Sequence, residues 1–136
     1  MRVEGRIFRS GKWWAIEIPI LDIYTQGRTR KEAFEMLRDA ARLIADDDGF
    51  ELQAYPSKGQ RFEAGSEDDA TFCALVLRRQ RQARGLSLRD VSERLGMKSR
   101  NAYARYEQGR AVPTIQKFEE LLKTVNPNIE LVVRVG

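Results

Sequence analysis

Residues 78–110, RRQRQARGLSLRDVSERLGMKSRNAYARYEQGR, carry most of the positive charge of this chain. They hold 10 Lys and Arg against 3 Asp and Glu, a net charge of +7, whereas residues 1–66 hold 11 of each sign. A compact basic unit inside an otherwise balanced protein is typical of nucleic-acid binding. The alternative is that these charges form an ordinary solvated surface. The spacing of the apolar, capping and glycine residues in the same stretch distinguishes the two interpretations.

That spacing predicts four helices. The first runs from about Asp68 to Gly85, and the fourth begins at Pro113-Thr114. Serine caps and glycine stops delimit the two short helices between them: Ser87, Gly96, Ser99 and Gly109. Apolar residues at helical intervals mark the predicted buried faces: Val91, Leu95, Tyr103, Tyr106, Ile115, Phe118, Leu121 and Leu122. Two short helices around a glycine turn, with a helix on either side, predict a helix-turn-helix.

In a helix-turn-helix the second helix lies in the major groove of DNA, with its N-terminal residues at base edges. The predicted base contacts are Arg100, Asn101, Ala104 and Arg105. Arginine can pair with guanine and asparagine with adenine, each through two hydrogen bonds. The predicted phosphate contacts are Arg81, Arg89, Lys98 and Arg110. For Arg81 and Arg105 an internal ion pair is the alternative, in the case of Arg105 with Glu107 or Asp90.

Three spaced motifs resemble the lambda-repressor-like (Xre or Cro/CI type) family. They are G-L-S at 85–87, V-S-x-R-L-G at 91–96 and R-Y-E-x-G-R-x-x-P at 105–113. The resemblance covers roughly residues 68–125 and implies binding to double-stranded DNA. The chain departs from the family at Leu88, where Gln is frequent, and in the turn at 96–99, which is one residue longer than usual.

The whole chain sets further bounds. Its 136 residues suit one large domain or two small ones. No apolar run approaches the length of a membrane span, and no signal peptide is recognisable, so a cytoplasmic protein is expected. The single cysteine, Cys73, excludes an internal disulfide and is expected to be a buried thiol. The absence of histidine removes the commonest general base and metal ligand. We therefore predict no catalytic residue, no metal site, no cofactor and no enzymatic activity.

The N-terminal half predicts a small α+β unit. Strands are expected at residues 2–9, 13–18, 23–26 and 50–55. Thr29 caps a helix between the third and fourth strands, with Glu32 completing a capping box. The loop after the fourth strand leaves room for another short strand at 61–64. The predicted fold class is thus α+β, with a β-β-β-α-β domain at 1–66 and an all-α helix-turn-helix domain at 67–126 that ends in a C-terminal strand at 127–136.

The last residues predict a strand with one apolar face, formed by Ile129, Leu131, Val133 and Val135. A lone strand after four helices has no partner in its own domain, and an unpaired apolar edge favours association. We therefore expect these four residues to dimerise by pairing with the same strand of a second subunit. A homodimer or higher oligomer would bring two recognition helices onto a palindromic operator.

The N-terminal half resembles the HicB antitoxin family through W-x-I-x-I-P at 14–19 and T-Q-G-x-T-x-x-E-A at 25–33, although Asp22-Ile23-Tyr24 replaces the family's Pro-Gly-Cys. The resemblance implies a truncated ribonuclease-H-like fold that binds a small HicA-like ribonuclease toxin, while the C-terminal domain represses the operon. Trp13 and Trp14 are the candidate toxin contacts, because adjacent strand residues point to opposite faces and one of them should be exposed. The alternatives are a stand-alone transcriptional regulator that senses a ligand or other partner, and, least favoured, an enzyme with a DNA-targeting tail.

Overall fold

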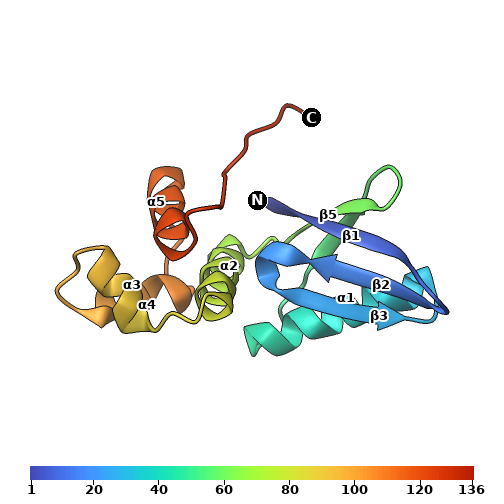
Figure 1. Cartoon of the computed structure of the whole chain (residues 1–136), viewed down its shortest axis with the longest axis horizontal. Coiled ribbons are helices and arrows are strands. Elements are labelled where there is room, and N and C mark those ends of the chain that lie inside the picture. The colour runs from blue at the N-terminus through green and yellow to red at the C-terminus, as the bar shows by residue number, and fades with distance from the viewer.

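The computed structural model describes the backbone of residues 1–136 and every side chain except that of Arg100. An antiparallel sheet with one helix forms the N-terminal half, and four helices form the C-terminal half (Figure 1). The elements in chain order are β1 (Arg2–Ser10), β2 (Trp13–Ile18), the 3₁₀ turn η1 (Pro19–Leu21), β3 (Ile23–Gly27), α1 (Arg30–Ala45), β4 (Gln53–Pro56), β5 (Arg61–Gly65), α2 (Asp69–Ala83), α3 (Leu88–Arg94), α4 (Arg100–Glu107) and α5 (Ile115–Val125). The α+β class is therefore confirmed.

The sheet has the strand order β3-β2-β1-β5-β4, so β5 lies between the first and fourth strands. The predicted β-β-β-α-β order lacks this fifth strand, which lies where the sequence left room for one at 61–64 and pairs with β1 over the register Gly5↔Phe62. The fourth strand is also shorter than residues 50–55. Phe50 and Leu52 precede it in a loop but are buried, because they fill the core rather than extend the ladder.

Helix α1 covers one face of the sheet. Ala33, Leu37 and Ala41 are buried along its inner side, and the rings of Phe34 and Phe62 meet edge to face with their centres 5.3 Å apart. The helix begins as expected, since the Thr29 side chain accepts a hydrogen bond from the Glu32 N–H at 3.0 Å. The Glu32 carboxylate accepts from the N–H of Arg28 instead of Thr29, so the capping box is displaced by one residue.

Helix α2 joins the two halves. It lies between the sheet and the cluster formed by α3, α4 and α5 (Figure 1). Six consecutive residues, 72–77, are buried, which an amphipathic surface helix does not show. A single hydrophobic core therefore runs through both halves of the chain. Helix α2 packs against η1 and α1 of the N-terminal half and against α4 and α5 of the C-terminal half. The division into domains at 1–66 and 67–126 therefore remains a prediction.

The C-terminal helices begin at their predicted caps. The side chains of Ser87, Ser99 and Thr114 each accept a backbone hydrogen bond in the first turn of α3, α4 and α5. Phe118, Leu121 and Leu122 of α5 are buried as expected. Ile115 is not, since 74% of it is exposed. It occupies the first turn of α5, one turn before the packed residues begin.

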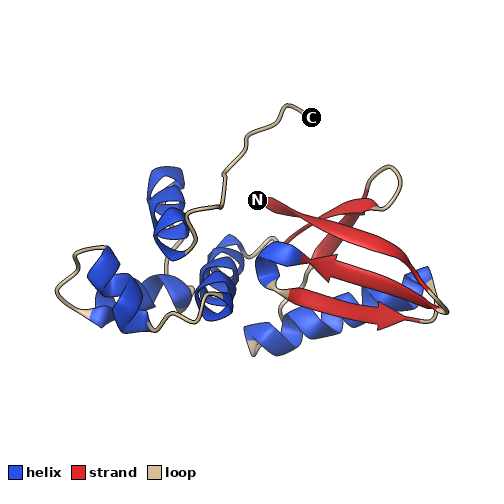
Figure 2. Cartoon of the chain, viewed as in Figure 1, coloured by secondary structure: helices blue, strands red, loops and turns tan.

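The C-terminal tail forms no strand in this chain. Residues 128–136 run as a loop away from the helices (Figure 2), and 90% of Val133 is exposed. This corrects the expected C-terminal strand. The physical reason is that a strand requires a hydrogen-bonding partner, and no sheet edge of the same chain pairs with the tail. None of the helices described is both long and apolar enough to cross a membrane.

Candidate nucleic-acid interface

Three of the four arginines at the C-terminal end of α2 are directed into the protein, whereas Arg84 at its C-cap is exposed. Arg79 donates from Nε to the Leu21 carbonyl and from Nη2 to the Asp22 carbonyl, both at 2.8 Å. Arg78 donates to the Ile44 carbonyl near the end of α1. These carbonyls belong to the ends of η1 and α1, where helix termini leave unpaired acceptors of negative partial charge. The two arginines therefore cap the N-terminal half, and their charge does not form part of an exposed DNA-facing surface.

Gln80 extends this connection to α5. Its side-chain N–H donates to the Ile20 carbonyl at 2.7 Å, and its Oε1 accepts from Asn126 Nδ2 at 2.9 Å. Asn126 immediately follows α5, and its backbone N–H donates to the Leu122 carbonyl in the last turn of that helix. A buried amide that uses both its donor and its acceptor adds specific geometry to a packed interface. The position of α5 is thus tied to η1 through one side chain of α2.

Arg81 forms a buried ion pair with Glu107 at the end of α4. Its Nε donates to both carboxylate oxygens, at 2.8 and 3.1 Å, and its Nη1 donates to the Leu86 carbonyl at 2.9 Å. The two side chains are only 14% and 6% exposed. Of the two roles expected for Arg81, the structure therefore favours the internal ion pair over the phosphate contact, because its guanidinium is engaged inside the protein. Glu107 pairs with Arg81 rather than with Arg105.

Tyr103 completes this buried group. Its hydroxyl donates to Glu107 Oε1 at 3.3 Å, and the residue has no exposed surface. Burial, with the Glu107 carboxylate as the second cause, raises the pKa of Tyr103 far above its usual range. The phenol consequently stays protonated and donates its hydrogen bond at all physiological pH values. The predicted core position of Tyr103 is confirmed, and Tyr106 is half-buried beside it.

The outer face of α4 is defined by this packing. Tyr103, Ala104 and Glu107 point inward, so the exposed residues are Asn101, Ala102, Arg105 and Gln108. Ala104 is 8% exposed, which corrects its expected role as a base contact. At about 100° per residue, Ala104 is only about 60° from the direction of the buried Glu107, so it lies on the inner side with Tyr103 and Glu107. Gln108 was missed, although its spacing of seven from Asn101 places it on the same face.

Two of the predicted base contacts lie on this outer face, namely Asn101 and Arg105. Asn101 is in the first turn of α4, and Arg105 follows one turn later. This is the end of the helix that meets base edges in a helix-turn-helix. The third, Arg100, is the first residue of α4, but its side chain lies outside the described part of the structure. Their contacts with DNA remain a prediction.

The three other predicted phosphate contacts are exposed. Lys98 lies in the turn before α4 and Arg110 in the loop after it, and neither makes an ion pair with any described side chain. Arg89 places Nε 3.0 Å from Glu93 Oε1 within α3. Both members of that pair are exposed, and such pairs hold side chains weakly. All three cations can therefore reach toward a phosphate backbone.

The turn between α3 and α4 has a defined geometry. Gly96 has a φ of 69°, and the N–H of Met97 donates to the Ser92 carbonyl at 2.9 Å while that of Gly96 donates to Glu93 at 3.1 Å. This pair of bonds is the Schellman arrangement that ends a helix at a left-handed glycine. Leu88 is half-buried against the core. The position where the lambda-repressor-like proteins that this stretch resembles often carry Gln therefore serves packing in this chain.

On the N-terminal half, the two adjacent tryptophans have different surroundings. Trp14 is half-buried against the core, with the Arg9 guanidinium 5.4 Å from its ring centre. Trp13 lies on the opposite face of the sheet and is 38% exposed. The pairing registers put Trp13 on the same open face as Glu17 and Tyr24. Tyr24 is also exposed, so the face opposite α1 presents aromatic side chains to solvent.

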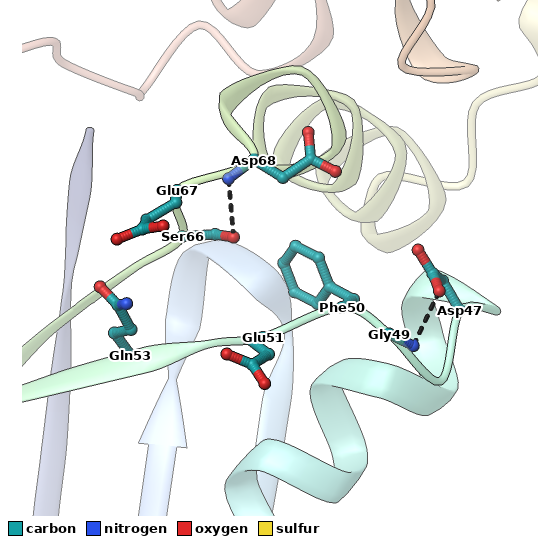
Figure 3. Close-up of a pocket in the computed structure, with 8 residues that line it drawn as sticks. All are labelled: Asp47, Gly49, Phe50, Glu51, Gln53, Ser66, Glu67 and Asp68. Carbon is teal, nitrogen blue, oxygen red and sulfur yellow. Dashed lines mark hydrogen bonds between the residues drawn. The ribbon is translucent and has the colours of Figure 1, made fainter.

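An acidic hollow lies where α1 and α2 meet the sheet (Figure 3). Asp47, Glu51, Glu67 and Asp68 contribute its carboxylates. Asp68 caps α2 by accepting from Thr71, which lowers its pKa, and Asp47 accepts from the N–H of Gly49. The carboxylates point in different directions, and among the described residues no three acidic, cysteine or histidine side chains come together to hold a metal ion. The arrangement of these carboxylates therefore gives no support for a metal site in this hollow.

Cys73 is buried in α2, as expected. Burial, with a smaller effect of Asp69, raises the pKa of its thiol to about 11. The thiolate is the reactive form of cysteine, so this side chain is poorly suited to act as a nucleophile at neutral pH.

Comparison with known families agrees with the geometry of the C-terminal half. Residues 74–126 match a family described as a helix-turn-helix domain. Helices α2 to α5 thus form a DNA-binding helix-turn-helix domain, and this class of domain acts on double-stranded DNA in transcription regulation. A search of curated proteins finds no match to the chain.

Proposed function

We propose that this protein is the antitoxin of a HicA/HicB-type toxin–antitoxin system and the repressor of its own operon. The observation that carries the DNA-binding part is the exposed face of α4 with Asn101 and Arg105, flanked in sequence by Lys98 and Arg110, which make no ion pair with any described side chain. Asn101 and Arg105 would contact bases. Lys98, Arg110 and Arg89 would contact phosphates and supply the salt-dependent part of the affinity.

The packing of α4 supports sequence-specific recognition. Base readout requires a helix that is held in one orientation, because each two-point hydrogen bond depends on its angle. The Arg81–Glu107 pair fastens the inner side of α4 to α2, and the Tyr103 hydroxyl holds the Glu107 carboxylate from one turn earlier in α4. The residues of the outer face are therefore presented by a helix with little freedom to rotate.

The toxin-binding part rests on the resemblance of residues 14–19 and 25–33 to HicB antitoxins. Those residues occupy the adjacent strands β2 and β3 and the start of α1. In this proposal the N-terminal half is a truncated ribonuclease-H-like scaffold without catalysis, and its open face masks a small basic ribonuclease of the HicA type. Trp13 and Tyr24 are suitable anchors, since exposed aromatic residues carry much of the energy of protein interfaces.

A ligand-sensing regulator has less support. An apolar cavity in the N-terminal half would favour it, but the acidic hollow of Figure 3 is polar. The second hollow, between α1, α2 and the end of α4, is lined in part by Asp47, Arg78 and Glu107 and opens to solvent. Neither has the enclosed apolar lining that is usual for small-molecule sites.

The proposal is tested by identifying whether a gene next to this one encodes a very small basic protein and co-expressing that protein with the full chain. We expect the two to co-purify, the small protein alone to cleave RNA, and the complex to be inactive. Trp13→Ala should weaken the complex, whereas Leu43→Ala, a change at a still more exposed apolar residue on α1, should leave it intact. Both variants should still bind DNA from upstream of the gene. A neighbouring protein that neither binds nor is inhibited would overturn the antitoxin role.

A further inference from the structure

The C-terminal tail has the pattern of a strand but no strand partner. Residues 129–135 read IELVVRV, and the side chains after Leu131 are largely exposed. Ile129 is half-buried against the core, and its N–H donates to the Asn126 carbonyl at 3.1 Å. The tail therefore starts from a fixed point at the end of α5 and continues as an open apolar edge, which proteins normally cover.

The contact that the tail makes within its own chain does not cover this edge. Arg134 reaches Glu63 on β5, and its side chain remains 63% exposed. Strand β5 lies inside the sheet between β1 and β4, so both of its edges are already hydrogen-bonded. This contact joins two side chains only. The backbone N–H and C=O groups of the tail are therefore not paired with those of a neighbouring strand.

We propose that the tail pairs with the same segment of a second copy of this protein, antiparallel and with Val132 opposite Val132. In this register Glu130 lies opposite Arg134 of the second copy, and by symmetry the same pair forms twice. Ile129 lies opposite Val135, and Leu131 opposite Val133. One face of the two-stranded ribbon is then apolar throughout, while the other carries two ion pairs on either side of the central valines. Directly opposed residues of this kind stabilise antiparallel pairs.

Other registers lose this match. A shift by one residue places Glu130 opposite Val133 or Val135, which also mixes the apolar and polar faces. A shift by two leaves Glu130 opposite Val132 or Gly136. Parallel pairing in register brings Glu130 beside Glu130 and Arg134 beside Arg134, and adjacent like charges are destabilising. The sequence of the tail thus selects one arrangement of two copies.

The ribbon has a consequence that rests on the proposed function. Because the tail follows α5 directly, pairing two tails joins two helix-turn-helix domains by a two-fold axis at Val132. Two copies of α4 would then face successive half-sites of a palindromic operator. The partner of this surface is a second copy of the chain, and the tail determines the spacing of the two recognition helices.

Cysteine cross-linking tests the register in the full-length protein without DNA. The only native cysteine, Cys73, is buried, so an intermolecular disulfide reports the new cysteine alone. Val132→Cys should oxidise to a covalent dimer, because residue 132 faces itself across the axis. Leu131→Cys and Val133→Cys should each cross-link poorly alone but readily when the two variants are mixed. Equal cross-linking by Leu131→Cys alone, or none by any variant, would overturn the register.

Charge exchange tests the two ion pairs independently. Glu130→Arg and Arg134→Glu should each raise the dimer dissociation constant at least several-fold in sedimentation equilibrium, and the double variant should restore it. Glu63→Gln is the matched control, since Glu63 contacts Arg134 only within one chain and its loss should leave the dimer intact. Thermal unfolding of each variant checks that the domains remain folded. A double variant as dissociated as the single ones would contradict the proposal. Because no DNA is present, failure of the proposed repressor role would not affect either result.

Discussion

Two sets of basic residues in the stretch 78–110 meet opposite environments. Arg78, Arg79 and Arg81 of α2 donate hydrogen bonds to carbonyls and to Glu107 within the protein. Lys98 and Arg105, on the turn and outer face of α4, are exposed to solvent. Both sets consist of basic side chains, and both come from the same stretch of the sequence. The net charge of +7 therefore overstates the charge available to DNA, and the location of each side chain decides its role.

The difference follows from the position of α2. This helix lies between the halves, so its C-terminal side chains meet the ends of η1, α1 and α4. The ends of η1 and α1 expose carbonyls of negative partial charge, and the end of α4 supplies the Glu107 carboxylate, which arginine can bind with several donors. The α3–α4 unit has the core on one side only. Its outer cations consequently find solvent, and they remain available for phosphates.

The largest expected effect comes from breaking the internal set. Glu107→Ala should lower the free energy of unfolding by about 3–5 kcal/mol, because it leaves the Arg81 guanidinium buried without its counter-charge. Urea unfolding measures this. Glu93→Ala removes the exposed pair with Arg89 and serves as the control, with an expected change below about 1 kcal/mol. Similar losses for both variants would mean that the Arg81–Glu107 pair is no more important than a surface pair.

The next effect concerns the external set. Arg105→Ala should weaken binding to a duplex selected by the wild-type protein from a random pool by about 1–3 kcal/mol, and it should relax the preference at one base pair. Arg110→Ala should weaken all sequences alike. Neither change should affect the unfolding free energy, since both side chains are exposed. An identical loss on selected and random duplexes for Arg105→Ala would remove its assignment as a base contact.

A smaller effect is expected inside the helix-turn-helix. The Ser92 hydroxyl is buried and has no hydrogen-bond partner among the described groups. Ser92→Ala should therefore raise the free energy of unfolding by about 1 kcal/mol, because a buried unpaired hydroxyl is unfavourable. Ser87→Ala is the matched control and should lower it by about 1 kcal/mol through loss of the α3 cap. Thermal unfolding of the two variants gives the sign of each change, and a loss in Ser92→Ala would indicate a hidden partner.

The smallest effect tests the end of α1, which Arg78 caps. Asp46 ends this helix with a φ of 53°, a left-handed conformation that glycine adopts without strain. Asp46→Gly should stabilise the protein by up to about 1 kcal/mol, and it also removes an acid from the negative end of the helix. Asp48 has no positive φ, so Asp48→Gly should give no gain. Equal unfolding midpoints for the two variants would show that the backbone of Asp46 is not strained.

The parts of the fold that depend on neighbouring residues were predictable. Thr29, Ser87 and Ser99 cap helices through contacts within three residues, and these caps located α1, α3 and α4. Strand β5 was predictable only as an option at 61–64, because it is short and its main partner, β1, is distant in the sequence. The partner of Arg81 was not predictable for the same reason, since Glu107 approaches it only in the folded chain. The error at Ala104 could have been avoided by phasing α4 from Tyr103 and Glu107 together, because Ala104 lies about 60° from the direction of Glu107.

The salt dependence of DNA binding tests the central claim most directly. The logarithm of the affinity for a random duplex falls linearly with the logarithm of salt concentration, with a slope of about −0.9 for each phosphate neutralised. Lys98→Ala should reduce the magnitude of that slope by about 0.9. Arg79→Gln, which keeps a donor for the Leu21 carbonyl, should leave the slope unchanged while the protein stays folded. An equal reduction by Arg79→Gln would show that the α2 arginines contact DNA and would contradict the division between the two basic sets.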